Sequence, residues 1–228
     1  MNTVKSLKDF QVKSLSEKHK VVETIKQYGI CKINNFLSGQ ILDDLTKEVK
    51  DVLEKPSELA YAFGKVQILR KANCYSPVIN KVFLSKEMLE VAQDYMGCPN
   101  LNYEVFVTHD YRHDNGLARN GYLHFDRAFT FKFLIYLSDV DENCGPFSIV
   151  PRSHFKGKKL REKTANDQYE DKKNRIFLDY PELGYTEEDI VPVLGEAGDL
   201  IIFDTDVFHM GGVVKEGFER LLIRGHTR

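Results

Sequence analysis

The apolar residues in the N-terminal part of the chain recur at the spacing of helices. Between Ser38, a residue type that caps helix N-termini, and Pro56, six apolar side chains recur at this spacing. They are Ile41, Leu42, Leu45, Val49, Val52 and Leu53. Helices are also predicted from Leu15 to Gln27 and from Ser85 to Gly97, because a glycine stands at or just after the end of each. A short strand, Ile30 to Asn34, is expected between the first two helices.

Beyond Leu101 the pattern changes to short runs of β-branched and aromatic residues. The runs are LNYEVFVTH, YLHFD, AFTFKFLIYL, FSIVP, DIVPVLG, DLIIFDT, GGVVK and RLLIRGH. Glycine, proline, asparagine and aspartate separate them, which is typical of the strands of a barrel or a double sheet. We therefore predict one mainly β domain over residues 1–228, with a helical part over about 1–97 and a β core over about 98–228.

Residues 156–175 interrupt this β-rich part with the charged segment KGKKLREKTANDQYEDKKNR. The segment is too polar to join a core, and we expect a solvated loop. A mobile lid or an anion-binding patch is the alternative.

Composition and charge narrow the class of protein. A chain of 228 residues with 42% apolar side chains can bury a sizeable core in one domain. The formal net charge of −2 argues against nucleic acid or an anionic membrane as the main partner, which leaves a small-molecule partner. No apolar run approaches the roughly 18 residues that span a bilayer, and the N-terminus lacks an apolar signal-peptide core. We therefore expect a cytoplasmic protein.

The four cysteines give no sign of a metal or redox motif. Cys31, Cys74, Cys98 and Cys144 lie far apart and form no C-x-x-C pair. This spacing argues against a zinc ribbon and suits a reducing compartment.

One of the seven histidines is followed two positions later by a carboxylate, in LHFDR. On a strand, residues i and i+2 point to the same face, so His124 and Asp126 can both reach one metal ion while Phe125 points away. About one H-x-[DE] is expected by chance in a chain of this composition, so the pair alone is a weak signal. A second histidine from a distant strand, such as His209 in IIFDTDVFH, would complete the facial triad of non-haem Fe(II) oxygenases.

Further segments accompany these residues in a fixed order. LHFDR is followed by NCGPFSIVPRSH and then by AGDLIIFDTDVFHMGG. This succession resembles the phytanoyl-CoA dioxygenase family of Fe(II)/2-oxoglutarate-dependent oxygenases. Its members share an H-x-D, an N-G-P-type turn before P-G-S-H, and a G-D-hydrophobic-F segment before the second histidine. YGICKINNFLSGQILDDL also resembles the opening strand and helix of the family, so the likeness runs from about residue 20 to 226. It implies a double-stranded β-helix, or cupin-like jelly roll, with helices packed outside.

The resemblance assigns roles to particular residues. His124, Asp126 and His209 correspond to the iron ligands of the family. Arg220, eleven residues after His209, corresponds to the arginine that grips the distal carboxylate of 2-oxoglutarate. A guanidinium suits this task because its rigid fork can hold a carboxylate through two charge-assisted hydrogen bonds. Arg224 is the alternative if the register shifts.

A second basic contact to 2-oxoglutarate remains open among three residues. Arg70 and Lys71 lie near the place where the family can supply one. Lys132 shares strand parity with Leu134 and can face into the barrel, where it would need a partner. The alternative is that local twist or a bulge carries its amine to solvent.

The implied activity is a dioxygenase that uses Fe(II), 2-oxoglutarate as co-substrate and O₂. It would hydroxylate an unactivated C–H bond of a small metabolite and release succinate and CO₂. Asp126 favours oxygenation over halogenation, because related halogenases lack this carboxylate. The substrate stays open among acyl-CoA thioesters, amino acids and natural-product intermediates. A cupin-type isomerase and a catalytically silent binding module are the competing classes.

Other positions depart from the family or carry weaker signals. Phe125 stands where many members have glutamine, and the chain has no tryptophan where some members place one near the co-substrate. His109 and His113, in THDYRHDNG, have metal-like spacing but are expected in a solvated loop, with a substrate-binding or lid role as the alternative. His154, in the PRSHF turn, is expected to be structural.

Overall fold

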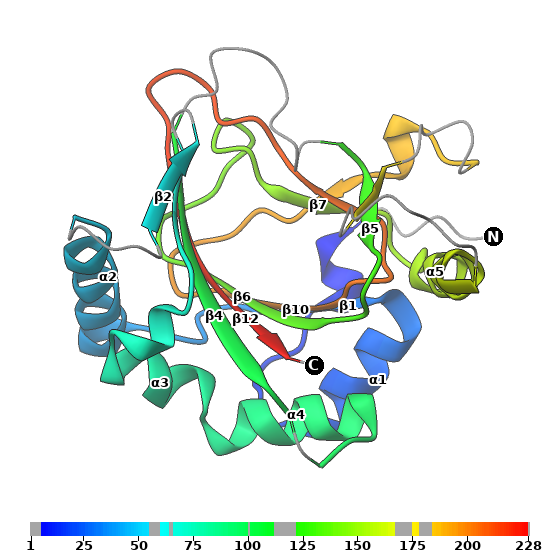
Figure 1. The fold of residues 1–228 in the computed structure, drawn as a ribbon, viewed down its shortest axis with the longest axis horizontal. Coiled ribbons are helices and arrows are strands. Elements are labelled where there is room, and N and C mark those ends of the chain that lie inside the picture. The colour runs from blue at the N-terminus through cyan, green and yellow to red at the C-terminus, as the bar shows by residue number, and fades with distance from the viewer. Residues whose placement is uncertain are drawn as a thin grey trace.

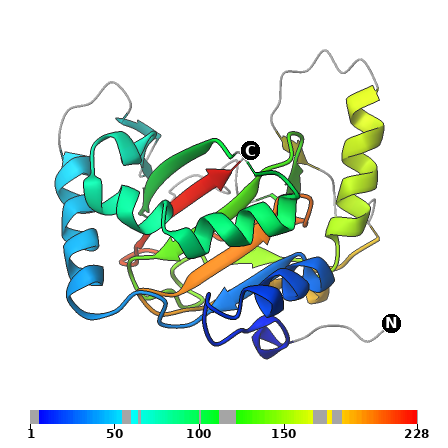
Figure 2. The same cartoon turned by 90° about the horizontal axis from the view of Figure 1, so that it is seen from below.

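The computed structural model describes residues 6–54, 60–63, 66–99, 101–111, 122–166, 175–177 and 184–227. Two antiparallel sheets face each other, and helices cover the outer face of the larger one (Figure 1). Seen from below, α4 (Lys86–Met96) and α1 (Lys18–Tyr28) lie across this sheet, while α5 (His154–Asn166) stands apart at one side (Figure 2). The mainly β fold class predicted from the sequence is confirmed.

Five α-helices are found in the described part of the chain. They are α1 (Lys18–Tyr28), α2 (Gly39–Glu54), α3 (Pro77–Phe83), α4 (Lys86–Met96) and α5 (His154–Asn166). The first ends at Gly29, whose φ of 80° lies in the left-handed region and whose N–H donates to the carbonyl of Ile25. Ser76 caps α3 by accepting a hydrogen bond from the N–H of Ile79.

Within the described ranges the large sheet has seven strands, and each neighbouring pair is antiparallel. In spatial order they are β1 (Ile30–Ile33), β10 (Leu200–Asp204), β6 (Phe131–Tyr136), β12 (Arg220–Thr227), β4 (Tyr103–Asp110), β3 (Val66–Leu69) and β2 (Ala60–Phe63). The small sheet has five strands among the residues that the structure describes, again all antiparallel. In order they are β8 (Arg175–Phe177), β5 (His124–Asp126), β11 (His209–Gly211), β7 (Phe147–Ile149) and β9 (Val191–Pro192).

The alternation of side chains along the strands separates two apolar layers. Odd-numbered residues of β6, such as Phe133 and Ile135, pack with residues of α1, α3 and α4 on the outer face. Even-numbered residues, such as Leu134 and Tyr136, pack with Phe147 and other small-sheet residues between the two sheets. The inner face of the large sheet therefore looks toward the small sheet, and the candidate site lies there.

The N-terminal part contains two strands and one helix that were not predicted. Residues 60–69 contribute β2 and β3, which continue the large sheet beyond β4, and α3 was not predicted either. Both strands have only four residues, which is too short for a clear alternating pattern.

Two predictions in the C-terminal part were wrong. Residues 156–166 of the charged segment are not a loop but continue α5, while 167–174 lie outside the described residues. The helix is tied to the turn after β10 by Arg161, whose guanidinium pairs with Asp206 at 2.6 Å. The run GGVVK is not a strand of its own, because β11 ends at Gly211 and Val214 forms only an isolated bridge with Cys144.

Candidate metal centre

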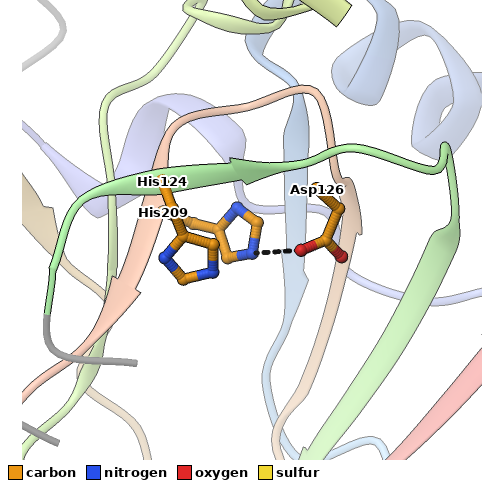
Figure 3. A group of neighbouring side chains, drawn as sticks. All are labelled: His124, Asp126 and His209. Atoms are coloured by element: carbon orange, nitrogen blue, oxygen red, sulfur yellow. Dashed lines mark ion pairs between the residues drawn. The ribbon is translucent and has the colours of Figure 1, made fainter. Parts of the chain in front are cut away.

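Two paired short strands of the small sheet bring the candidate ligands together. β5 and β11 are antiparallel, and His124 stands directly opposite His209. The two imidazole rings lie 4.3 Å apart, centroid to centroid. Asp126 is two residues beyond His124 on β5, so its carboxylate lies on the same face as the imidazole (Figure 3).

Backbone carbonyls fix the tautomer of both histidines. Nδ1 of His124 lies 2.8 Å from the carbonyl oxygen of Tyr122, and Nδ1 of His209 lies 2.7 Å from that of Val207. A carbonyl oxygen can only accept, so each Nδ1 carries the proton and donates it. Each Nε2 then keeps a lone pair, which is the form of histidine that binds a metal.

Lys132 on β6 holds the carboxylate of Asp126 on the side that points away from the histidines. The Lys132 ammonium donates to Oδ2 at 2.5 Å, and both side chains are buried. Oδ1 lies 4.0 Å from Nε2 of His209. Burial raises the pKa of Asp126, but the charge of the Lys132 ammonium and its hydrogen bond to the carboxylate outweigh burial and lower this pKa below its usual range. Asp126 is therefore ionised at neutral pH.

Together the three side chains have the chemistry of a metal site. Their ligand atoms all lie within 4.8 Å of one another, and all three residues are buried. Two imidazoles and one carboxylate are the donor set of the facial triad that suits Fe(II) with open coordination positions. The rings of Phe203 and Phe147 lie 5.2 Å and 5.8 Å from the His209 ring and keep this side of the site apolar.

A pocket between the sheets joins this centre to the predicted co-substrate arginine. His124, His209, Lys132 and Arg220 all line it. Arg220 is buried at the start of β12, directly opposite Asp110 at the end of β4. Its Nη2 and Nε donate to Oδ2 of Asp110 at 2.7 Å and 3.2 Å. The sequence did not predict the contact of Asp110 with Arg220, because Asp110 stands in a polar segment that resembles a loop.

The other basic residues that were candidates for a contact to 2-oxoglutarate differ in how far they are buried. Lys132 is 4% exposed and lines the pocket, so of the two alternatives its side chain faces into the barrel and not to solvent. Arg224 also lines the pocket. Arg70 is half exposed and pairs with Glu104 at 3.4 Å, and Lys71 is exposed.

The remaining histidine predictions have mixed outcomes. His109 does not lie in a loop: it is buried in β4, and its ring contacts Glu219 at 2.9 Å and the Tyr111 hydroxyl at 2.8 Å. His113 lies outside the described residues. His154 is buried at the first position of α5, and its Nε2 lies 3.1 Å from the carbonyl of Lys26, which fits a structural role.

A double-stranded β-helix with two histidines and one aspartate on adjacent strands defines the class of cupin-like 2-oxoglutarate oxygenases. A model of the phytanoyl-CoA dioxygenase (PhyH) family matches residues 25–220. The chain belongs to this family, which is dependent on Fe(II) and 2-oxoglutarate. None of the curated protein sequences matches it.

Solved structures of this class share the fold at low sequence identity. The α-ketoglutarate-dependent epimerase SnoN of nogalamycin biosynthesis is 15% identical, with a TM-score of 0.71 over 93% of this chain and 83% of SnoN. HygX from Streptomyces hygroscopicus, solved with nickel and 2-oxoglutarate, is 17% identical, with a TM-score of 0.64 over 90% and 85%. EctD from S. alaskensis, solved with iron, is 13% identical, with a TM-score of 0.64 over 91% and 75%.

No helix among the described residues has the length and apolar character to cross a membrane.

Proposed function

We propose that this chain is one Fe(II)- and 2-oxoglutarate-dependent dioxygenase domain, with His124, Asp126 and His209 as the iron ligands. The observation that carries the proposal is the convergence of the ligand atoms of these three buried side chains within 4.8 Å, in a PhyH-family fold, beside a pocket that both histidines line. The tautomers of both histidines support it, because each Nε2 is free of its proton. Iron bound there, with 2-oxoglutarate and O₂, would supply the oxidising power to hydroxylate a C–H bond and release succinate and CO₂.

The surrounding residues have distinct tasks in this proposal. Arg220 would hold the distal carboxylate of 2-oxoglutarate, and Asp110 orients its guanidinium from across the strand pair. Lys132 holds Oδ2 of Asp126, which leaves Oδ1 on the histidine side. It also lines the pocket, where its charge would favour a carboxylate of the co-substrate. Phe147 and Phe203 limit access of water to the centre.

The partner in this account is a small organic substrate. The neighbours HygX and EctD were solved with the small molecules hygromycin B and 5-hydroxyectoine, which supports this class of partner. Hydroxylation is the reaction we propose. Epimerisation is a second candidate because the similar structure SnoN is an epimerase. The carboxylate of Asp126 supports oxygenation rather than halogenation, since a halide would need its position.

Turnover of the co-substrate tests the proposal. Purified protein with Fe(II), 2-oxoglutarate and air should release succinate, faster with a true substrate from a metabolite panel. Asp126→Ala should abolish this release, while His19→Ala should not, because His19 is an exposed helix residue far from the site in sequence. Wild-type protein that neither binds 2-oxoglutarate nor forms succinate with any panel member would exclude the function. Analysis of the organic product distinguishes a hydroxylated from an epimerised substrate.

A further inference from the structure

We propose that Ser153 is a positioning residue for His209, which it holds in the metal-binding tautomer through the peptide group between Val207 and Phe208. The inference rests on the proposed function, in which His209 is an iron ligand. Ser153 lies in the turn between β7 and α5, and it is fully buried. Its effect on the imidazole is transmitted by the backbone.

One peptide group connects Ser153 with His209. The N–H of Phe208 donates to Oγ of Ser153 at 2.7 Å. The carbonyl oxygen of Val207 lies 2.7 Å from Nδ1 of His209 and accepts its proton. This N–H and this carbonyl belong to the same planar peptide unit, so the direction of one fixes the direction of the other. The hydroxyl of Ser153 therefore sets the plane in which the carbonyl meets the imidazole.

The hydroxyl of Ser153 continues a chain of hydrogen bonds that all run in one direction. It donates to the carbonyl of Val150 at 2.6 Å, so its oxygen accepts from Phe208. The chain thus leads from the imidazole through the Val207–Phe208 peptide and the hydroxyl to Val150. Hydrogen bonds aligned in this way polarise one another. A more strongly accepting Val207 carbonyl raises the basicity of the imidazole nitrogen that would bind a metal.

The turn that carries Ser153 is itself held in an unusual conformation. Arg152 has a φ of 68°, in the left-handed region, where the family pattern P-G-S-H has glycine. A residue with a side chain keeps this conformation only where its surroundings fix it. The N–H of Arg152 donates to the carbonyl of Tyr28 at 2.8 Å, and its guanidinium lies over the Tyr28 ring, 5.1 Å from the centroid. Ser153 is therefore presented to Phe208 by a fixed backbone.

The backbone of His209 depends on this turn because its own strand is short. β11 has three residues and begins at His209. The N–H of Val150 donates to the carbonyl of Phe208 at 2.9 Å, so both backbone polar groups of Phe208 are bonded to the segment from Val150 to Ser153. This segment fixes the residue that directly precedes the ligand.

Two positions are open to the single proton of the neutral His209 ring. Nε2 faces Oδ1 of Asp126 at 4.0 Å, and this carboxylate attracts a proton to Nε2 (Figure 3). The Val207 carbonyl holds the proton on Nδ1 instead. The second tautomer leaves the lone pair of Nε2 for a metal. A fixed Val207 carbonyl therefore favours the form of His209 that binds a metal.

Nitrogen NMR of the metal-free protein at pH 8.5 tests the inference. In wild type, both His124 and His209 should carry the proton on Nδ1. In Ser153→Ala the buried N–H of Phe208 loses its acceptor, and at least about one tenth of His209 should carry the proton on Nε2. His124 should not change, because its ring is bonded to the carbonyl of Tyr122. Ser153→Thr, which keeps the hydroxyl, should restore the wild-type tautomer.

Calorimetry gives a second readout. Ser153→Ala should bind Ni(II) about tenfold more weakly than wild type, because residues that orient a metal ligand contribute to affinity on this scale. Once loaded with Ni(II), the variant should bind 2-oxoglutarate within twofold of wild type. Arg220, the proposed partner of the distal carboxylate, is held by Asp110 and not by the turn of Ser153.

Ser148→Ala is the matched control. Ser148 is also a buried serine whose hydroxyl donates to a backbone carbonyl, that of Pro146, at 3.2 Å. It lies on β7 opposite Met210, so it is as close to His209 in the sheet as a serine outside the proposed chain can be. Its replacement should leave both tautomers and the Ni(II) affinity unchanged.

The remaining outcomes separate this inference from the proposed function. An unchanged His209 tautomer in folded Ser153→Ala overturns the inference, and so does a changed tautomer with unchanged Ni(II) affinity. An equal change in His124, or in Ser148→Ala, also overturns it, because a general loosening of the small sheet would then explain the result. If Ser153→Ala does not fold, Ser153→Cys, whose sulfur is a weak acceptor, is measured with the same expectations. Wild type that carries the Nδ1 proton on both histidines but binds no Ni(II) overturns the proposed function.

Discussion

At the scale of single residues, the stability of the folded protein depends on the buried ion pair between Asp126 and Lys132. Both side chains are buried, and the ammonium is the group that keeps the carboxylate ionised against the cost of burial. Breaking a buried ion pair by removing one partner leaves an uncompensated charge, which costs far more than losing an exposed pair.

Lys132→Met should therefore destabilise the metal-free protein by about 3 kcal/mol. A divalent metal ion should reduce this loss, because it gives the Asp126 carboxylate a second positive partner. Urea unfolding with and without Ni(II) measures both effects. Lys47→Met is the control, since Lys47 and Asp51 form an exposed pair on α2, and it should have little effect in either condition. An equal loss with and without metal would contradict the proposed placement of the ion.

The histidines give a second residue-scale prediction. His124→Ala should lower the affinity for Fe(II) or Ni(II) by a hundredfold or more, because it removes one of three protein ligands. His154→Ala is an internal comparison: it removes another buried histidine, one bonded to the backbone of Lys26, and should leave metal affinity unchanged. Metal titration by calorimetry gives both values. Unchanged affinity in His124→Ala would remove this residue from the site.

Sequence reasoning at this scale depended on local spacing. His124 and Asp126 could be predicted to share a face because the strand period is two. Asp110 could not be assigned to Arg220, because the two residues are far apart in sequence and meet only through the β4–β12 register. The pairing of Lys132 with Asp126 could not be predicted either, because it joins strands of the two different sheets. The sequence indicated only that a buried Lys132 would need a partner.

At the scale of secondary-structure elements, α5 shows where sequence reasoning fails. Its charge predicted a solvated loop, yet the helix packs on the turn between β10 and β11 through Arg161 and Gly157. A Cβ on Gly157 would collide with the backbone carbonyl of Asp206. This close approach of two backbone segments is a tertiary contact, so the hydrophobic pattern of the sequence does not indicate it. The strands β4, β6, β10 and β12 were predicted because each has a long β-branched or aromatic run.

Gly157→Ala should thus destabilise the protein by about 1–3 kcal/mol, even though alanine is the better helix former. The Asp206 carbonyl must move away, and α5 with it. Lys158→Ala, at the next position of the same helix and exposed, should be close to neutral. Thermal unfolding of both variants measures the difference. Stabilisation by Gly157→Ala would show that α5 does not pack on this turn.

At the scale of the whole molecule, Asp204 makes stability depend on pH. Burial raises the pKa of its carboxyl to about 6, and the hydroxyl of Tyr95 donates to it at 2.5 Å. Because this pKa is higher in the folded than in the unfolded chain, the neutral form favours folding. The contribution is fully present below about pH 4 and is lost as the pH rises through 6.

Asp204→Asn should remove this dependence. Relative to wild type, the variant should gain up to about 3 kcal/mol between pH 4 and pH 7, because an amide does not ionise. Urea unfolding at several pH values measures the difference between the two proteins, which cancels the other titrating groups. A difference that stays constant with pH would show that the Asp204 carboxyl has an ordinary pKa.

The central claim for the whole molecule is that the three buried ligands and Arg220 form one iron and 2-oxoglutarate site. Its most direct test is the binding of 2-oxoglutarate without O₂, measured by calorimetry with and without Fe(II). The account predicts that Fe(II) strengthens binding at least tenfold in wild type and has no effect in Asp126→Ala. Equal 2-oxoglutarate affinity with and without Fe(II) in wild type would contradict it.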